Sequence, residues 1–447
     1  MMDSILFWNQ VSLDAAKMDF ASPTPADAPS PQQPGPTYAA RALAIVHLAM
    51  HDAYMGIKGT GSPKTYLDYS PATPGTTDLQ AAQAAVAAAA CLTLIAMFSK
   101  QRDTFLAKHQ EFLVQVPDTD PKIAKGLAWG KLVAERMLAH RHNDGSDASN
   151  DQYAPSTLPY RHRPDPLTPQ GFLGPLWGKV APFGINNLNT AITALPNPVN
   201  LPEYVADFNE VKAIGQEQSA TRTIKQTNIG LFWAYDGARN IGVPPRLYNQ
   251  VVRAIIEKKG GVTEAQNAKI FAMVNVAMAD AGIQAWHEKY IHNLWRPVVG
   301  IREADAGWGP SGIGDSKPGT TGDPYWKPLG APRTNSSGAP SLTPHFPAYP
   351  SGHATFGTAA MRVAQLALGL PDTFAFDFVS DELNGINVGA TGIRPRYKNV
   401  LTIKDAINEN VLSRVYLGVH WKFDGLKGQQ IGEEIATKIV AAFPAMA

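Results

Sequence analysis

The sequence predicts an all-α fold: a large helical domain built around helix bundles, with long Pro- and Gly-rich loops and little β structure. Three observations lead to this expectation. Apolar residues recur at spacings of three and four over eight segments, whereas the alternation typical of strands is scarce. The 36 Pro and 38 Gly residues are concentrated between those segments. With 447 residues, 44% of them hydrophobic, the chain can also bury a large core.

The predicted helices are spread over the whole chain. They cover residues 39–57, 79–99, 122–140, 204–217, 246–259, 263–295, 353–368 and 431–443. Three segments between or before them, residues 22–37, 144–175 and 306–350, predict long loops. Loops of this length in a compact protein are often functional.

Composition and charge exclude several classes of function. The formal net charge is +1, so we expect no nucleic-acid partner and no attraction to an anionic membrane. A single cysteine, Cys91, excludes an intramolecular disulfide. The N-terminus lacks the basic region of a secretory signal, so we expect a soluble, cytoplasmic protein, with export by another route left open. Residues 81–98 are half alanine, which favours a packed helix over a membrane span.

The first candidate site is HLAMHD at residues 47–52. His47 and His51 lie one helical turn apart and could chelate a metal. However, no acidic residue lies between them, as it would in a zinc protease helix, and the surrounding sequence is strongly apolar. We therefore interpret the two histidines as a buried, hydrogen-bonded pair.

The second candidate is KYIHNLWRP at residues 289–297. Lys289 and Arg296 are seven positions apart, almost two helical turns, so we expect them on one face of a helix that ends at Pro297. A solvated basic face is the alternative. The aromatic neighbours, including Trp286 and Trp295, favour enclosed cations, which need anions to compensate them.

The third candidate is PSGH at residues 350–353, directly before a small-residue helix. Ser351 and Gly352 would lie at the helix N-terminus, where free backbone N–H groups and the helix dipole favour an anion. His353 is then placed to exchange a proton beside that anion. A helix capped by Ser351 without further function is the alternative.

The fourth candidate is SRVYLGVHWKFDG at residues 413–425. On one straight helix Arg414 and His420 would diverge by about 120°. A break at Gly418 would let them converge. Asp424 lies one turn after His420 and could orient its ring. An ordinary amphipathic helix, with Asp424 as an N-terminal charge, is the alternative.

Taken together, the four stretches favour an oxyanion site. Three of these side chains are cationic, two histidines titrate near neutrality, and carboxylates occur only as possible supporting partners. This set suits phosphate or a group of the same shape. It does not suit Mg²⁺ or Ca²⁺, which require oxygen ligands.

The order K-x6-RP, PSGH and SR-x5-H-x3-D resembles the vanadium-dependent haloperoxidases and the type 2 acid phosphatases that share their site. The flanking stretches ILFWNQVSLD, ARALAIVHLAMHDAY, GDPYWKPLGAPRTN and FPAYPSGHATFG are similar to the fungal vanadium chloroperoxidase type. The similarity extends from about residue 5 to residue 424, and the fungal type continues further beyond the histidine block. The HLAMHD block recurs in this family without being a metal site.

The resemblance implies a vanadate (V⁵⁺) cofactor, without haem or flavin, that has His420 as its single protein ligand. The other cofactor-binding residues that it implies are Lys289, Arg296, Ser351, Gly352 and Arg414. His353 would act as acid and base, and Lys289 would polarise the bound peroxide. Residues 216–447 would then be the helical half that carries the vanadate site, and residues 1–215 a structural helical half of the same compact unit.

The resemblance also assigns supporting positions. Asp236 would pair with Arg414, while Trp286 and Phe346 would line the halide side. Phenylalanine at position 346, where bromoperoxidases commonly have histidine, favours the chloroperoxidase side. His345 departs from the proline expected there, and could either reach the site or lie on the surface.

The implied activity is the oxidation of chloride or bromide by hydrogen peroxide to hypohalous acid, which halogenates small organic nucleophiles. Two alternatives stay open. One is an acid phosphatase in which His420 is the nucleophile and His353 the general acid, with phosphate in the site when vanadate is absent. The other is a non-catalytic oxyanion-binding protein. The sequence makes no prediction of the oligomeric state.

Overall fold

The computed structural model describes residues 2–21, 31–60, 64–116, 121–148, 153–336 and 338–444. Within these ranges there are fourteen α-helices and only two small antiparallel sheets of two strands each. The predicted all-α fold with little β structure is therefore confirmed. The loops expected at 144–175 and 306–350 are present where they are described, whereas residues 22–30 of the first predicted loop lie outside the described ranges.

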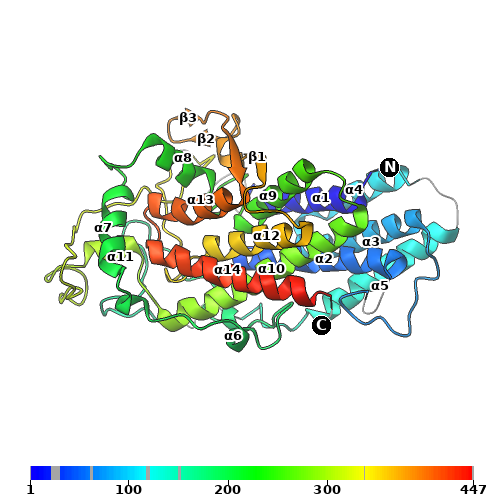
Figure 1. The fold of residues 1–447 in the computed structure, drawn as a ribbon, viewed down its shortest axis with the longest axis horizontal. Helices are drawn as coiled ribbons and strands as arrows, with labels where there is room; N and C mark the ends of the chain where they lie inside the picture. Colours follow the sequence, from blue (N-terminus) through cyan, green and yellow to red (C-terminus); the bar gives the residue numbers. More distant parts are fainter. Residues whose placement is uncertain are drawn as a thin grey trace.

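The long helices run roughly along the longest axis of the molecule (Figure 1). In the order in which neighbours pack, they are α5 (Pro121–His140), α3 (Leu79–Met97), α2 (Pro36–Lys58), α10 (Glu264–His292), α12 (Gly352–Leu368) and α14 (Lys422–Ala442). Helices of intermediate length flank this row: α1 (Ser4–Met18), α4 (Arg102–Val114), α9 (Pro244–Lys259) and α13 (Ile403–Tyr416). The central helices thus form one continuous packed array.

The remaining elements are short. The short α-helices are α6 (Leu188–Ala191), α7 (Tyr204–Ile214), α8 (Ile224–Phe232) and α11 (Pro297–Arg302). Strand β1 (Ala375–Val379) pairs with β4 (Lys398–Thr402), with Asp377 opposite Val400, and β2 (Val388–Gly389) pairs with β3 (Gly392–Ile393). The 3-10 turns are η1 (Ser99–Gln101), η3 (Trp177–Lys179), η4 (Pro198–Asn200) and η5 (Asp381–Leu383).

Helix α10 shows how local sequence sets the ends of an element. Thr263 caps its start, since the Thr263 side chain accepts from the Gln266 N–H while the Gln266 side chain accepts from the Thr263 N–H at 2.9 Å. The helix ends at His292, and its C-cap Asn293 adopts the left-handed conformation with φ of 53°. The predicted helix 263–295 was therefore three residues too long at its end.

This early end corrects the expectation for Lys289 and Arg296. Arg296 does not share a helix face with Lys289, because it is the N-cap of the next helix, α11, which Pro297 begins. The chain turns between them at Asn293. The two cations converge through this turn and not through helical periodicity.

Other predicted boundaries were wrong in informative ways. Helix α14 begins nine residues before the predicted 431, and α7 ends three residues before the predicted 217. Helices α1, α4 and α8 were not predicted. Helix α13 was not predicted either, although its last residues, 413–416, belong to the stretch 413–425 that was weighed as an amphipathic helix. Its buried face includes polar side chains such as Asn410, Ser413 and Arg414.

Helix α3 is the apolar, alanine-rich segment. Within the described ranges it is the one helix with the length and hydropathy of a membrane span, and most of it is buried by neighbouring helices. Gly126 and Gly130 of α5 lie against the carbonyl oxygens of Ala81 and Ala85 so closely that a Cβ at either glycine would overlap them. The small residues therefore let two helices pack at short range, as predicted for a packed helix.

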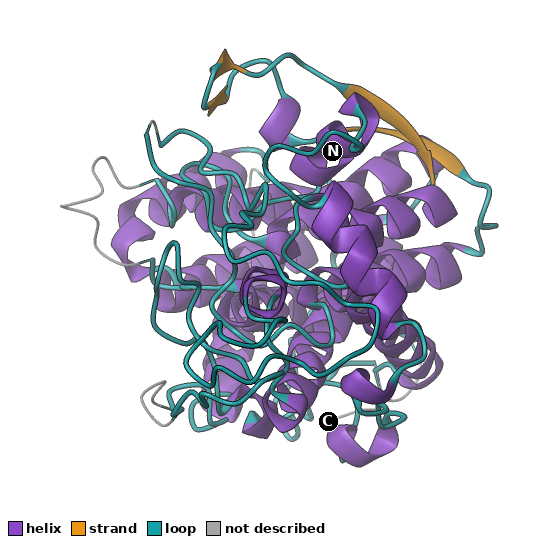
Figure 2. Ribbon diagram, turned by 90° about the vertical axis from the view of Figure 1, so that its left-hand side faces the viewer, coloured by secondary structure: helices purple, strands orange, loops and turns teal. Residues whose placement is uncertain are grey.

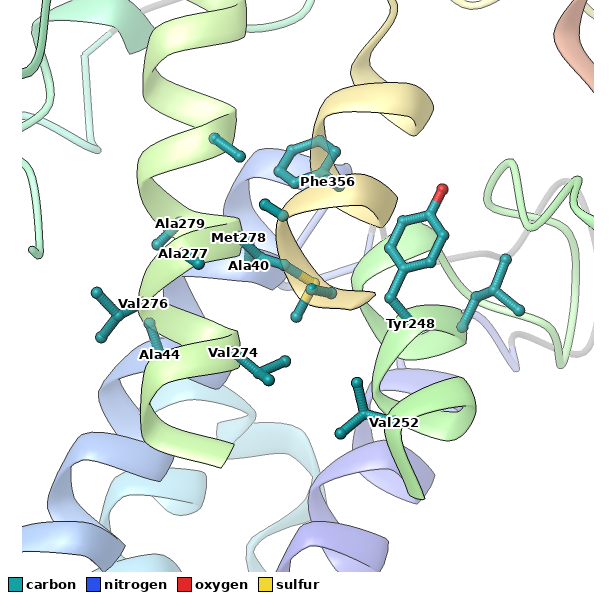
Figure 3. Close-up of a cluster of buried hydrophobic side chains, with 14 of the residues drawn as sticks. Ala40, Ala44, Tyr248, Val252, Val274, Val276, Ala277, Met278, Ala279 and Phe356 are labelled. Atoms are coloured by element: carbon teal, nitrogen blue, oxygen red, sulfur yellow. The ribbon is translucent and has the colours of Figure 1, made fainter. Parts of the chain in front are cut away.

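The core is shared by residues from both predicted halves. Figure 3 shows side chains from α2, α9, α10 and α12 meeting in one apolar cluster. Its labelled members include Ala40, Ala44, Tyr248, Val252, Val274, Met278 and Phe356. The same cluster extends from Ile5 to Phe443. The division at residue 215 stays a prediction.

One end of the array gathers several helix termini. Helices α13 and α14 are joined at the left-hand end of Figure 1, where α10 ends and α12 begins. Viewed from that side, loops cover the ends of the helices (Figure 2). Residues 289, 296, 353, 414 and 420 lie at or close to these helix termini and are buried.

Candidate active site

Lys289 lies in the last turn of α10 and is fully buried. Its Nζ donates to the backbone carbonyls of Pro347 at 2.8 Å and Ala348 at 3.0 Å, and also to that of Pro350. Burial lowers the pKa of Lys289 well below its ordinary value, and the charge of Arg296 adds to this. The lysine is therefore enclosed among backbone carbonyls and is not part of a solvated basic face.

Arg296 is equally enclosed. Its Nε donates to the carbonyl of Phe346 at 2.8 Å, and its Nη1 donates to the carbonyl of Val419 at 2.8 Å. The same Nη1 lies 2.8 Å from Nε2 of His420. Its Nη2 is buried and has no hydrogen-bond acceptor among the described residues. A buried guanidinium N–H without an acceptor is costly and indicates a site for an anionic oxygen.

Arg414 comes from the last turn of α13. Its Nη1 and Nη2 donate to the two oxygens of Asp236 at 2.9 and 2.8 Å, which is the pairing that the family resemblance implies. Its Nε is buried and, within the described part of the chain, has no acceptor. Asp236 thus binds the two terminal nitrogens of the guanidinium, and the Nε–H is left to bind an anionic oxygen.

The PSGH stretch forms the N-terminus of α12. Ser351 is its N-cap, and the Ser351 Oγ accepts from the Ala354 N–H. A Cβ at Gly352 would lie 3.1 Å from the ring of Trp286, so a larger residue would be crowded. The first N–H groups of a helix have no acceptor within it. The helix therefore adds backbone donors and a favourable dipole to the three cations.

His353 lies in the first turn of the same helix. Its Nε2 lies 2.6 Å from the carbonyl oxygen of Ala234 and 3.9 Å from Oδ1 of Asp236. Because Nε2–H donates to that carbonyl, the lone pair is on Nδ1. Burial, together with the charge of Arg414, lowers the pKa of His353 to about 3, although Asp236 acts in the opposite direction. The ring is thus neutral, and an anion bound nearby would favour its protonation.

The break between α13 and α14 positions His420. Gly418 has φ of +70°, and a Cβ there would overlap the carbonyl oxygen of Gly215, so both conformation and space require glycine. Helix α13 ends before this glycine, and α14 begins after His420. The predicted break at Gly418 is therefore confirmed.

Asp424 in the first turn of α14 contacts the ring of His420. Nδ1 of His420 lies 2.9 Å from Oδ2 of Asp424, which also accepts from the Trp421 N–H at 3.0 Å. Burial raises the pKa of Asp424, whereas Lys289 and Arg296 oppose that rise. With Nδ1–H directed at Asp424, the lone pair of His420 is on Nε2, where it accepts from Nη1 of Arg296; a ligand at Nε2 would replace this hydrogen bond. Asp424 therefore both orients the His420 ring and supplies a charge at the N-terminus of α14, which are the two roles that the sequence left open.

HLAMHD lies apart from this site. His47 contacts the Leu43 carbonyl at 2.7 Å and Nδ2 of Asn9 at 2.9 Å. Nδ1 of His51 lies 2.8 Å from Oδ1 of Asp52. Both rings are buried and are held by different partners, so the prediction of a buried, hydrogen-bonded pair is confirmed.

The residues assigned to the halide side line one cavity beside the cations. The rings of Trp286 and Phe346 have centroids 4.7 Å apart, and Nζ of Lys289 lies 5.2 Å from the centroid of Phe346. His345, whose place the sequence left open, also lines the cavity. Burial, together with Arg296, lowers the pKa of His345 to about 4. His353 and His420 line the same cavity.

Sequence reasoning missed several neighbours of the site. The cavity is also lined by residues of the N-terminal half: Phe20, Pro34, Gly35, Pro36, Gln170 and Leu173. This half therefore shapes the cavity in addition to supporting it. Arg333 lines the cavity too, and the similarity of GAPRTN to the family was the only sequence feature that indicated it.

His162 is buried, and no described residue bonds either ring nitrogen. No motif in the sequence had indicated His162.

The donor set fits an oxyanion such as vanadate. Among the residues that the structure describes, no three His, Cys, Asp or Glu side chains cluster as a metal-ion site. The site instead presents three buried basic side chains, two guanidinium nitrogens without an acceptor among the described residues, a helix N-terminus and the imidazole Nε2 of His420. Vanadate needs one nitrogen ligand and hydrogen-bond donors for its oxygens, and these are the groups that are present.

Comparisons with known proteins agree with this chemistry. Residues 2–176 match the vanadium chloroperoxidase N-terminal domain, and residues 269–446 match the VCPO second helical-bundle domain. The chain is 31% identical to the vanadium chloroperoxidase of Curvularia inaequalis over 522 aligned residues, which cover 98% of this chain and 81% of that protein.

Two solved structures show the same fold at lower identity. A bacterial vanadium-dependent iodoperoxidase superposes with a TM-score of 0.70 and 21% identity, covering 97% of this chain and 95% of that one. A holo-type bacterial vanadium-dependent chloroperoxidase gives a TM-score of 0.68 and 16% identity, covering 95% and 96%. The fold is therefore common to proteins named for different halides.

Proposed function

The chain belongs to the vanadium chloroperoxidase family, and we propose that it is a vanadium-dependent haloperoxidase that oxidises chloride and bromide with hydrogen peroxide. The observation that carries this proposal is that two buried guanidinium nitrogens, Nη2 of Arg296 and Nε of Arg414, have no hydrogen-bond acceptor among the described residues. Buried cationic donors of this kind require an anion.

Residues from several helix ends are assigned a role toward vanadate in this proposal. Nε2 of His420 would be the ligand atom, because Asp424 occupies the opposite ring nitrogen. Oxygen atoms of the anion would accept from Arg296, Ser351, Gly352 and Arg414, while Lys289, whose three N–H groups donate to backbone carbonyls, would contribute its positive charge. When bound, vanadate supplies a Lewis-acid centre at which peroxide is activated and halide is oxidised.

His353 is the residue that we assign to proton transfer. Its Nε2–H is held by the Ala234 carbonyl, which fixes the ring and leaves Nδ1 as the basic atom. A neutral imidazole at this place can take a proton from hydrogen peroxide and later return it to the departing oxygen. Asp236, 3.9 Å from Nε2, stabilises the imidazolium formed in between.

Lys289 would stabilise negative charge that develops on oxygen. Its three carbonyl partners fix the position of Nζ, so little reorganisation is required when the charge appears. The halide would lie near Phe346, since Lys289 and Arg296 lie 5.2 and 4.9 Å from its ring centroid. Phenylalanine at this position is the reason to include chloride as a substrate.

A phosphatase activity is the second candidate, because the same donors would hold phosphate. His420 Nε2 would then be the nucleophile and His353 the general acid. The two functions share a site and differ in what they require: the phosphatase needs no vanadium, whereas halide oxidation needs vanadate and peroxide.

The experiment measures both activities on one preparation. Purified protein, freed of vanadium and then supplied with orthovanadate, peroxide and bromide, should brominate a phenolic dye, and chloride should support a slower reaction. The vanadium-free protein should not brominate. Absence of bromination at every pH from mildly acid to neutral refutes the proposal, and phosphate release from an aryl phosphate without vanadium would favour the phosphatase.

The His353→Ala variant tests the assignment of the proton-transfer group. Loss of a general acid–base group lowers turnover by about 10²- to 10⁴-fold, while vanadate should stay bound. His142→Ala, at an exposed histidine, is the matched control and should retain full activity. Equal activities of the two variants would contradict the assignment.

A further inference from the structure

The cavity beside the site is large and apolar enough for an organic molecule. Its volume is about 180 Å³. Side chains that form its apolar wall include Phe20, Leu173, Val243, Leu342, Phe346 and Phe356. An engineered apolar cavity of about 150 Å³ is sufficient to bind benzene. One aromatic ring therefore fits in this cavity, whereas peroxide and a halide ion are too small to require it and would gain nothing from its apolar walls.

The polar groups of the cavity are unevenly placed. His353 and His420 mark the side that belongs to the proposed oxidising centre, and His345 adds a neutral imidazole beside Phe346. Arg333 also lines the cavity but is exposed to solvent. Unlike Arg414, it forms no ion pair with any carboxylate in the described part of the chain. A pocket with apolar walls and a few polar groups is typical of small-molecule sites.

We propose that this cavity binds the organic substrate, a single-ring hydroxyaromatic molecule that carries an anionic substituent. The ring lies against Phe346 and Leu342, the anionic group faces Arg333, and the hydroxyl group faces His345. This inference rests on the proposed haloperoxidase function, and it adds that halogenation takes place on a bound molecule and not only by hypohalous acid released to solution.

The chemical step balances without a further reactant. Hypohalous acid, formed from halide and peroxide at the adjacent centre, is the oxidant. A ring carbon bonds the halogen while the bond between halogen and oxygen breaks. The ring proton leaves with the hydroxide so released as one molecule of water. The ring is oxidised by two electrons, and the halogen is reduced from its +1 state.

The test is a competition between phenol and 4-hydroxybenzoate with bromide as the halide. Hypobromous acid added as a reagent brominates the two in a fixed ratio that depends only on their chemistry. The enzyme should shift that ratio toward 4-hydroxybenzoate by about fivefold, the effect of a solvent-exposed ion pair. An enzyme ratio equal to the reagent ratio, with bromination proceeding, overturns the proposal.

Two variants separate the charge from the cavity. Arg333→Gln should return the ratio toward the reagent value, whereas the control Arg102→Gln, at an exposed arginine of α4, should not. Leu342→Trp fills part of the cavity and should return the ratio to the reagent value. If Arg333→Gln and Leu342→Trp both leave the enzyme's preference for 4-hydroxybenzoate unchanged, the proposed site is wrong.

A binding measurement makes the result independent of catalysis. Calorimetric titration of vanadium-free protein with 4-hydroxybenzoate should show saturable binding, weakened about fivefold in Arg333→Gln and lost in Leu342→Trp. If no halide is oxidised at all, the proposed function fails, and this titration still decides whether the cavity binds the aromatic anion. Absence of saturable binding in the wild-type protein overturns the inference in either case.

Discussion

Replacement of Asp236 by asparagine should destabilise the vanadium-free protein and be rescued by vanadate. The carboxylate of Asp236 is 6% exposed, and it makes two hydrogen bonds to the fully buried guanidinium of Arg414. The asparagine side chain keeps the shape of the aspartate but removes its charge, so Arg414 becomes an uncompensated buried cation. Breaking a buried pair in this way costs about 3–5 kcal/mol.

Bound vanadate should return part of this loss. An oxyanion beside Arg414 compensates the same charge, and hydrogen bonds to charged groups contribute about 1.5–3 kcal/mol. The increase in unfolding free energy on adding saturating vanadate should therefore be larger for Asp236→Asn than for the wild type, by about 1–2 kcal/mol. Thermal unfolding of both proteins, with and without vanadate, measures the difference.

Asp381→Asn is the matched control for Asp236→Asn. Asp381 lies 2.7 Å from Nη1 of Arg246, which is 3% exposed, and this pair is not part of the site. Its loss should lower the melting temperature in the same direction, but vanadate should stabilise this variant no more than it stabilises the wild type. The reasoning is refuted if vanadate stabilises Asp236→Asn by the same amount as the control, or by less.

Three further changes have defined outcomes. His420→Ala should lose vanadate during gel filtration while the wild type retains it, because the only nitrogen ligand is removed; metal analysis of the protein peak decides this. Ser351→Ala removes the N-cap oxygen of α12 and should lower stability by about 1 kcal/mol, seen in denaturant unfolding; an unchanged midpoint would show that the cap contributes nothing. Gly126→Ala places a methyl group against the Ala81 carbonyl and should cost about 1–3 kcal/mol, whereas Gly171→Ala, with no atom within 4 Å of the added carbon, should be neutral.

Much of the site could be predicted because its residues lie in short motifs with local physical meaning. A serine and glycine before a helical pattern predict an N-terminus that can bind an anion, and the structure has α12 there. A glycine between Arg414 and His420 predicts a break, and Gly418 provides it. These inferences need only the geometry of one or two turns.

Features that depend on tertiary packing could not be predicted in the same way. Lys289 and Arg296 were expected on one helix face, but the turn at Asn293 separates them, and loop carbonyls from residues 346–350 hold both cations. The wall that Phe20 and Leu173 contribute comes from distant segments that no local pattern connects to the site. Polar residues buried in α13 hid its helical periodicity.

The central claim is that one oxyanion, held by His420 and the buried cations, makes this protein a halide-oxidising enzyme. Titration of the vanadium-free protein with orthovanadate, while bromination is followed in the presence of peroxide, tests it most directly. Activity should rise from zero and saturate at one vanadate per chain, and added phosphate should compete. Bromination that is present without vanadium and unchanged by its addition, or absent at every vanadate concentration, would contradict the claim.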